Sequence, residues 1–163
     1  MEVALLAARL ATSSDVAEVT RLWDLAVCAL EGQRGGSALA ASISQDAPRD
    51  DPAALIKASE SAIVLGLIDD VPVGISHATL QRIGGNVVAG LDLIFVEPAA
   101  RRIGVADTML EVLLERCAAW GTNTVDALAL PGDRATKALF EAHGFKARLL
   151  VMQRVQAPAG NGA

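Results

Sequence analysis

Apolar residues at the start of the chain change from a continuous run to a helical repeat. Residues 3–11 are mostly apolar and predict a first strand, and Asp15 with Glu18 three residues later is typical of a capping box. Apolar side chains then recur at steps of three and four residues, at positions 16, 19, 22, 23, 26, 27 and 30. This spacing predicts an amphipathic helix that ends near Gly32.

The middle of the chain alternates between turn signals and short apolar runs. Residues 33–51 mix glycine, serine, proline and charge, which predicts a short helix, a mobile loop, and a second short helix from about Pro52. From Ala62 onward, apolar runs are separated by Asp-Asp-Val-Pro and Gly-Gly-Asn turns. Three antiparallel strands joined by hairpins are therefore expected before Pro98.

The last third returns to a helical period. A helix is expected after Pro98 and through Trp120, with Gly121 as its C-cap. Residues 124–130 predict a strand, residues 133–143 a helix and residues 145–155 a last strand. A disordered tail is expected at residues 157–163, so residues 1–156 form one domain, in keeping with a chain of 163 residues.

Composition excludes several classes of function. The chain is 52% hydrophobic, but charges interrupt every apolar run before the roughly 18 residues that a membrane span needs. Glu2 and Arg9 do not fit a signal peptide, so we expect a cytoplasmic protein. A net charge of −5 without a basic stripe argues against nucleic acid. Cys28 and Cys117 have no metal-ligand spacing and are expected to be buried thiols, with no metal bound.

The junction EPAARRIGVAD carries the clearest chemical signal. A helix N-terminus with small residues exposes unpaired N–H groups and the positive end of the dipole, so it binds anions. The P-loop pattern GxxxxGK[ST] and the pattern GxGxxG are both absent. The pattern [RQ]xxGx[GA] is present at Arg101, Gly104 and Ala106, after a V-x-P stop at Val96 and Pro98. This resembles the coenzyme-A-binding motif of the GNAT acetyltransferases.

Neighbouring segments extend the resemblance over roughly residues 8–155. The opening ARLATSSD is similar to the family's first strand and helix cap, and TVDALALPGDRATKALFEAHGF is similar to its strand, helix and Gly-Phe turn. The resemblance implies an α/β (α+β) fold with a mixed, mostly antiparallel sheet flanked by helices. It places the acetyl-CoA pyrophosphate loop between the fourth strand and the following helix.

The resemblance also implies a set of residues that bind acetyl-CoA. Backbone N–H groups near Gly104 reach a pyrophosphate only if the side chains there are small, which explains Gly104 and Ala106. Asp107 is expected to face solvent, away from the phosphates. The expected coenzyme contacts are Val96, Arg101, Arg102, Ile103, Gly104, Val105, Ala106, Asp133 and Phe140.

Acetyl transfer to an amine also needs a base. A primary amine with a pKa of about 10.4 is almost wholly protonated at neutral pH, so a group that accepts its proton helps the reaction. Asp92 is a charge inside the apolar run LDLIFV and is the first candidate, followed by His77 on the preceding strand and Glu97 beside Pro98. His143 is a weaker candidate near the Gly-Phe turn.

The chain departs from the family pattern at the general acid. Many family members have a tyrosine four residues before the glycine of Gly-Phe, whereas this chain has Phe140 and no tyrosine. Phe140 either faces the sulfur of the coenzyme, as the resemblance implies, or packs under Phe145 at the end of the helix. A thiolate can leave without a general acid, although more slowly, because the pKa of the thiol is only about 8.5.

The sequence therefore predicts an acetyl-CoA-dependent N-acetyltransferase that acts on a small-molecule or protein amine. A non-catalytic acyl-CoA-binding module is the alternative favoured by the missing tyrosine, and a dimerisation domain is a third. The sequence does not identify the acceptor, because residues 33–51 contain no recognisable motif. The apolar residues 147–152 suggest a possible homodimer.

Overall fold

A mixed β-sheet forms the centre of the molecule. The structure is a computed structural model that describes residues 4–46 and 51–157, and in these residues the sheet has five strands in the order β1-β2-β3-β4-β5. Neighbouring strands are antiparallel except for β4 and β5, which are parallel. The strands are β1 (Leu6–Leu10), β2 (Ser61–Ile68), β3 (Val71–Ile83), β4 (Asn86–Val96) and β5 (Val125–Ala127). The predicted sheet is confirmed, although β5 is shorter than the predicted strand at 124–130.

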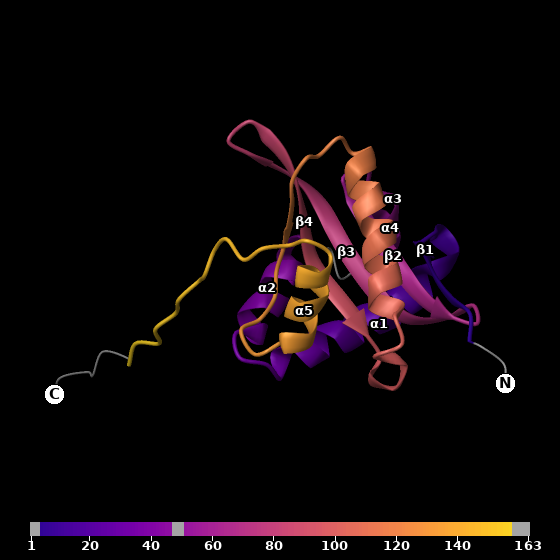
Figure 1. The fold of residues 1–163 in the computed structure, drawn as a ribbon, viewed down its shortest axis with the longest axis horizontal. Helices are drawn as coiled ribbons and strands as arrows, with labels where there is room; N and C mark the ends of the chain where they lie inside the picture. Colours follow the sequence, from indigo (N-terminus) through magenta and orange to yellow (C-terminus); the bar gives the residue numbers. More distant parts are fainter. Residues whose placement is uncertain (1–3, 47–50, 158–163) are drawn as a thin grey trace.

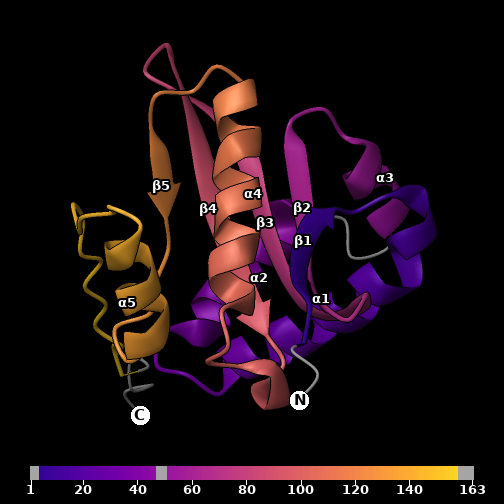
Figure 2. The same ribbon diagram turned by 45° about the vertical axis from the view of Figure 1, so that its right-hand side comes forward.

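Helices cover both faces of this sheet. They are α1 (Val16–Glu31), α2 (Gly36–Asp46), α3 (Pro52–Lys57), α4 (Val105–Ala119) and α5 (Arg134–Ala142), with short 3-10 turns η1 (Ser13–Asp15) and η2 (Pro98–Ala100). α1, α2 and α3 pack on one face, and α4 and α5 pack on the other (Figure 1 and Figure 2). Among the described residues, no helix combines the length and the apolar character needed to cross a membrane.

The region predicted as loop and short helices contains α2 and α3. α3 begins at Pro52, as expected, and the Asp51 carboxylate caps it by accepting from the Ala54 amide at 2.9 Å. The predicted mobile loop at residues 47–50 lies outside the described residues. Gly36 allows α2 to start directly against α1, since a Cβ built there would lie 1.6 Å from the carbonyl oxygen of Leu30.

Two glycines allow α4 to lie close against the sheet. Gly66 on β2 and Gly74 on β3 are register partners beneath this helix. A Cβ built at Gly66 would lie 2.6 Å from Cγ1 of Val105 and 2.8 Å from Sδ of Met109. Any side chain at position 66 would therefore push the start of α4 away from the sheet, together with the loop that precedes it.

A buried carboxylate holds the turn before α1. Asp15 accepts from the Arg9 guanidinium at 2.7 and 2.8 Å and from the Thr12 amide at 2.7 Å. The Arg9 guanidinium holds the pKa of Asp15 well below its ordinary value. The predicted pairing of Asp15 with Glu18 is wrong, because the 3-10 turn η1 precedes α1 and makes Thr12 the cap of the box. Glu18 instead pairs with Arg21 at 2.9 Å.

Left-handed glycines end α4 and α5, as the sequence predicts. Gly121 and Gly144 have φ of 77° and 84°. At the end of α5, the Gly144 amide donates to the Glu141 carbonyl at 3.1 Å and the Phe145 amide donates to the Phe140 carbonyl at 3.0 Å. This is a Schellman motif, and its hydrophobic contact joins the rings of Phe140 and Phe145 at 5.3 Å between centroids.

The segment after α5 differs from its prediction. Residues 145–155 are predicted to form a last strand, but they have no regular secondary structure, and the chain runs away from the body (Figure 1). A strand needs the backbone of a neighbour, and none of the described strands pairs with this segment. Arg148 binds Asp126 of β5, whereas Leu149 and Met152 are 75% and 83% exposed. Of the predicted tail, residues 158–163 lie outside the described residues.

The two cysteines have different environments, although both are predicted to be buried. Cys117 on α4 is buried in the core, and this burial raises the pKa of its thiol to about 11. Cys28 is exposed, because it lies on the side of α1 that faces away from the sheet. The prediction is therefore wrong for Cys28.

Candidate active site

The loop between β4 and α4 leaves a row of backbone amides without acceptors. Gly104, just before the helix, has φ of 100°, a left-handed conformation that favours glycine. Within the described part of the chain, the N–H groups of residues 104–107 have no protein acceptor. These are the groups that a helix leaves unpaired at its positive end. The loop therefore has the geometry of an anion site, and Gly104 and Ala106 keep it clear of large side chains.

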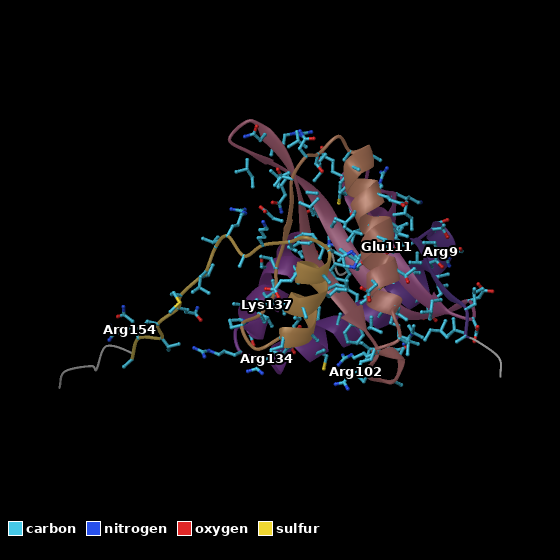
Figure 3. All side chains as sticks on the ribbon, viewed as in Figure 1. Arg9, Arg102, Glu111, Arg134, Lys137 and Arg154 are labelled. Atoms are coloured by element: carbon cyan, nitrogen blue, oxygen red, sulfur yellow. The ribbon has the colours of Figure 1, made fainter. Side chains whose placement is uncertain are left out.

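Arg101 and Arg102 take different roles in this loop. Nε of Arg101 donates to the Val96 carbonyl at 2.8 Å, and its guanidinium lies 5.8 Å from the centre of the Phe95 ring. Arg102 is exposed, has φ of 67°, and forms no ion pair with any described residue. Figure 3 shows it at the outer edge of the loop below α4. Arg101 fixes the loop to the end of β4, and Arg102 leaves a cation available beside the amides.

Asp92 is an extra residue in β4. In the register with β3, His77 lies opposite Leu93 and Ala78 lies opposite Leu91, so Asp92 has no partner between them. A β-bulge of this kind bends the strand and redirects a side chain. Leu91 is also the last residue of β4 that pairs with β5. The bulge therefore coincides with the point where the two parallel strands separate.

A cleft of about 760 Å³ opens where β4 and β5 diverge. Residues 92–96 form one wall, residues 128–130 face them, and residues 104–107 contribute the free amides. α1 and α2 line the cleft as well, and the turn between them reaches the opposite wall, since a Cβ built at Gly35 would lie 3.7 Å from Cδ2 of Leu130. The anion site and Asp92 thus open into the same cleft.

The Asp92 carboxylate begins a chain of hydrogen bonds that leads into the core. Its Oδ1 lies 2.8 Å from Nδ1 of His77, and Nε2 of His77 lies 3.0 Å from the Ser61 hydroxyl. The His77 side chain is fully buried, with the Trp23 ring against it at 5.2 Å between centroids. Because an ionised carboxylate only accepts, Nδ1–H of His77 donates to Asp92, and Nε2 of His77 shares a hydrogen bond with the Ser61 hydroxyl. This chain fixes the orientation of the carboxylate at the cleft wall.

Most of the residues expected to bind the coenzyme line this cleft. They are Val96, Arg101, Arg102, Gly104, Val105, Ala106 and Asp133. Ile103 lies on the outside of the loop and is 49% exposed. Asp133 is also the N-cap of α5, since its carboxylate accepts from the amide and the hydroxyl of Thr136 at 3.0 and 2.7 Å.

Glu97 and Phe140 are further predicted site residues that do not line the cleft. Glu97 binds Arg21 at 2.6 Å, and Arg21 also donates to the Pro72 carbonyl, so Glu97 ties α1 to the end of β4. Phe140 is only 5% exposed and packs on Phe145, which is the packing arrangement that the sequence left open. A contact between Phe140 and the coenzyme stays a prediction.

His143 does not line the cleft. Its Nε2 lies 3.1 Å from Oδ1 of Asp107, whose side chain is 55% exposed but lines the cleft mouth beside the free amides, so the expectation that Asp107 faces away from the anion site stays a prediction. This contact joins the end of α5 to the start of α4. His143 therefore supports the position of the anion loop.

Sequence reasoning missed Ser61 and the contribution of α1 and α2. Ser61 begins β2 and is 8% exposed, and its bond to His77 depends on the register of β2 with β3. Only a correct pairing of these strands would have revealed that contact. The α1 and α2 residues at the cleft carry no chemical motif, so their position follows from the packing of the helices alone.

The cleft can perform two chemical tasks. Its free amides and Arg102 suit a phosphate, and Asp92, 16% exposed and oriented by His77, can hold an ammonium group or accept a proton from it. Among the described residues, no group of three or more His, Cys, Asp and Glu side chains is placed to hold a metal ion. The chemical groups of the cleft are therefore the free amides of residues 104–107 and the Asp92 carboxylate.

Comparison with solved structures finds the same fold. An aminoglycoside acetyltransferase, AAC(6')-Iy, solved in complex with a bisubstrate analogue of coenzyme A, superimposes with a TM-score of 0.69 at 16% identity, over 94% of this chain and 99% of that one. HMB0005, an aminoglycoside acetyltransferase from an uncultured soil metagenomic sample, gives 0.69 at 17% identity, over 94% and 99%. A putative acetyltransferase from Agrobacterium tumefaciens gives 0.66 at 18% identity, over 92% and 99%.

Sequence comparison identifies the family more directly. A search of curated proteins returned no match. The family model described as acetyltransferase (GNAT) family matches residues 19–145, which include most of α1, the bulged strand β4, the anion loop and the Schellman turn. The expected resemblance is confirmed by this match over most of the chain, and the chain belongs to the GNAT acetyltransferase family.

Proposed function

We propose that this acetyltransferase transfers the acetyl group of acetyl-CoA to a primary amine held beside Asp92. The observation that carries the proposal is the position of the free amides of residues 104–107 and of the Asp92 carboxylate in one cleft. A solved structure of the same fold, the aminoglycoside acetyltransferase AAC(6')-Iy, is known in complexes with coenzyme A and with a bisubstrate analogue, which supports the choice of donor.

The residues of the loop fit the phosphates of the coenzyme. The amides of residues 104–107 and the positive end of α4 face the cleft, with Arg102 beside them. Among the described strands, β4 has no partner beyond Leu91 on this side, so the backbone groups of residues 93–95 that face away from β3 are available to the rest of the coenzyme. Acetyl-CoA supplies the acetyl thioester, and the residues of this cleft form its binding site.

Asp92 acts on the acceptor amine. An ammonium ion is attracted to the carboxylate, and the proton that it must lose before attack passes to Asp92 directly or through a water molecule. The neutral amine then forms a C–N bond with the acetyl carbon as the C–S bond of the thioester breaks, and coenzyme A leaves as a thiolate that takes up a proton from water. The bond from His77 keeps one carboxylate oxygen occupied, which leaves the other oxygen for the amine. A carboxylate is a weak base, so its main contribution is to place the amine and shorten the path of the proton.

Asp92→Asn tests this assignment. The variant keeps the size of the side chain and loses its charge, so turnover with acetyl-CoA and an amine should fall by about 10²–10⁴ while coenzyme affinity stays unchanged. Thiol release and calorimetry measure the two quantities. Asp24→Asn removes an exposed carboxylate from α1 and should keep full turnover. Full activity of Asp92→Asn would contradict the role, and coenzyme binding by the native protein without any transfer would favour an acyl-CoA-binding module.

We also propose that residues 146–157 pair with a second copy of the chain. Leu149, Leu150, Val151 and Met152 are at least 72% exposed, an arrangement that costs free energy in water and is relieved when a partner covers it. Light scattering at micromolar concentration should give a dimer. Leu149→Asp with Val151→Asp should give a monomer, whereas Ile83→Asp, at an exposed site on β3, should leave the dimer intact. A native protein that remains monomeric would contradict this proposal.

A further inference from the structure

The acceptor side of the cleft has an apolar wall with a single carboxylate. Beyond Asp92 the cleft is lined by Ala29, Leu30 and Leu39 from the α1–α2 region, and by Leu128 and Leu130 from the segment after β5. Gln33 is the polar side chain there, and its amide donates to the Ala29 carbonyl at 3.3 Å. Apart from Gln33, the side chains in this group are aliphatic.

Charges over the whole cleft are balanced. The described lining residues include the carboxylates of Asp92, Asp107 and Asp133. They also include the guanidinium groups of Arg101, Arg102 and Arg134, so the charged side chains of the lining cancel. Figure 3 shows Arg102 and Arg134 on the same side of the molecule, near α5 and the base of α4. Arg101 and Arg102 lie beside the loop assigned to the phosphates, so Asp92 is the charged side chain that an acceptor meets on the other side of the cleft.

The lining carboxylates other than Asp92 lie at the N-termini of α4 and α5. Asp107 bonds to His143 at 3.1 Å, and Asp133 caps α5 through Thr136. Among the described lining residues, Asp92 is the carboxylate that lies on a strand, away from the helix N-termini assigned to the phosphates, and its bond to His77 occupies one of its oxygens. On the acceptor side, these residues therefore offer one carboxylate for one ammonium group.

Resting on the proposed function, we infer that the acceptor is a primary amine with one positive charge and an apolar body. Its ammonium group meets Asp92, and its body lies against Leu39, Leu128 and Leu130. A second ammonium group would have to lose its hydration against aliphatic side chains without a partner. This excludes as preferred acceptors the polycationic, polyhydroxylated amines named for several solved relatives.

The inference is tested with two amines of the same length. Hexylamine and hexamethylenediamine differ by a second amino group, and neamine adds a polycation. Binding of each is measured by calorimetry to the protein saturated with coenzyme A, and acetyl transfer is measured separately with acetyl-CoA. Hexylamine should bind at least about tenfold more tightly than hexamethylenediamine, because the second ammonium group of the diamine would lie against aliphatic side chains. A preference for hexamethylenediamine or neamine, or no binding of hexylamine, would overturn the inference.

The two readouts separate this inference from the proposed function. A hexylamine preference in binding without acetyl transfer supports the apolar pocket and refutes the transferase assignment. Acetyl transfer that favours the polycation refutes the apolar pocket and leaves the transferase assignment intact.

A single substitution tests whether the wall sets the preference. Leu128 is 53% exposed, so Leu128→Glu adds a carboxylate to the wall without disturbing the core. The ratio of hexamethylenediamine to hexylamine affinity should rise by at least about tenfold. Leu25→Glu is the matched control, since Leu25 is 41% exposed on α1 and does not line the cleft, and it should leave the ratio unchanged. An unchanged ratio in Leu128→Glu would contradict the inference.

Discussion

Replacing Gly104 by glutamate should remove coenzyme binding while the fold is retained. Gly104 is in the left-handed region at φ of 100°, and a Cβ built there would lie 3.4 Å from Leu6 Cδ1, so a side chain fits sterically. The backbone conformation costs a non-glycine residue about 1–2 kcal/mol. For a chain of this size, that penalty lowers the melting temperature by only about 2–8 °C. The variant should therefore remain folded at room temperature.

The effect on binding comes from charge. A carboxylate about 5 Å from a bound phosphate repels it by about 3 kcal/mol at an effective dielectric constant of about 20. Together with any rotation of the amides of residues 104–107, this should weaken binding of acetyl-CoA by about 100-fold or more. Isothermal titration calorimetry measures the affinity, and circular dichroism with a melting curve reports the fold.

Gly121→Glu provides the matched control for this experiment. Gly121 also has a positive φ, 77°, lies at the opposite end of α4, and has no atom within 4 Å of a built Cβ. It should lose at least as much stability, because the backbone penalty is the same and the added carboxylate lies at the negative end of α4, but it should bind acetyl-CoA normally. Native affinity in Gly104→Glu, or an equal loss in both variants, would refute the anion-site reasoning.

Three further predictions concern the support of the site. Gly66→Ala should cost about 1–3 kcal/mol of stability, because its Cβ would overlap Val105 and Met109, while Gly132→Ala, with no atom within 4 Å, should be neutral in thermal unfolding. Because Arg9 lowers the pKa of Asp15, the ionised carboxylate stabilises the fold above about pH 4, and this stabilisation is lost as the pH falls. The free energy of unfolding in urea should therefore change less between about pH 5 and pH 2 in Asp15→Asn than in the native protein, and an equal change in both would count against the ion pair. Phe140→Tyr should lower the melting temperature without faster acetyl transfer, since a hydroxyl without a partner costs about 1–3 kcal/mol in this buried position, whereas a stable and faster variant would place the ring at the acyl site.

Local signals in the sequence predicted the parts of the fold that depend on local physics. Periodicity located the helices, and glycine and proline located the turns, because these features act over a few neighbouring residues. The anion loop belongs to the same class, since Gly104 and the start of α4 are adjacent in the chain. The left-handed Gly121 and Gly144 were predicted for the same reason.

Features that depend on distant partners were predicted less well. The last strand failed because its apolar residues indicate a tendency to pair but not the presence of a neighbour. Asp92 and His77 were each named as candidates, but the bond between them requires the bulge and the register of β3 with β4. Glu97 looked equally available in the sequence, and only the packing of α1 reveals that Arg21 already binds it.

The most direct test of the account is the product of the reaction. Native protein, acetyl-CoA and hexylamine should yield N-acetylhexylamine by mass spectrometry and one free coenzyme thiol for each molecule of product. Asp92→Asn should bind acetyl-CoA with native affinity and form product at least about 100-fold more slowly. The proposed acetyl transfer is contradicted if the native protein binds acetyl-CoA but acetylates no primary amine. The role of Asp92 is contradicted if Asp92→Asn forms product at the native rate.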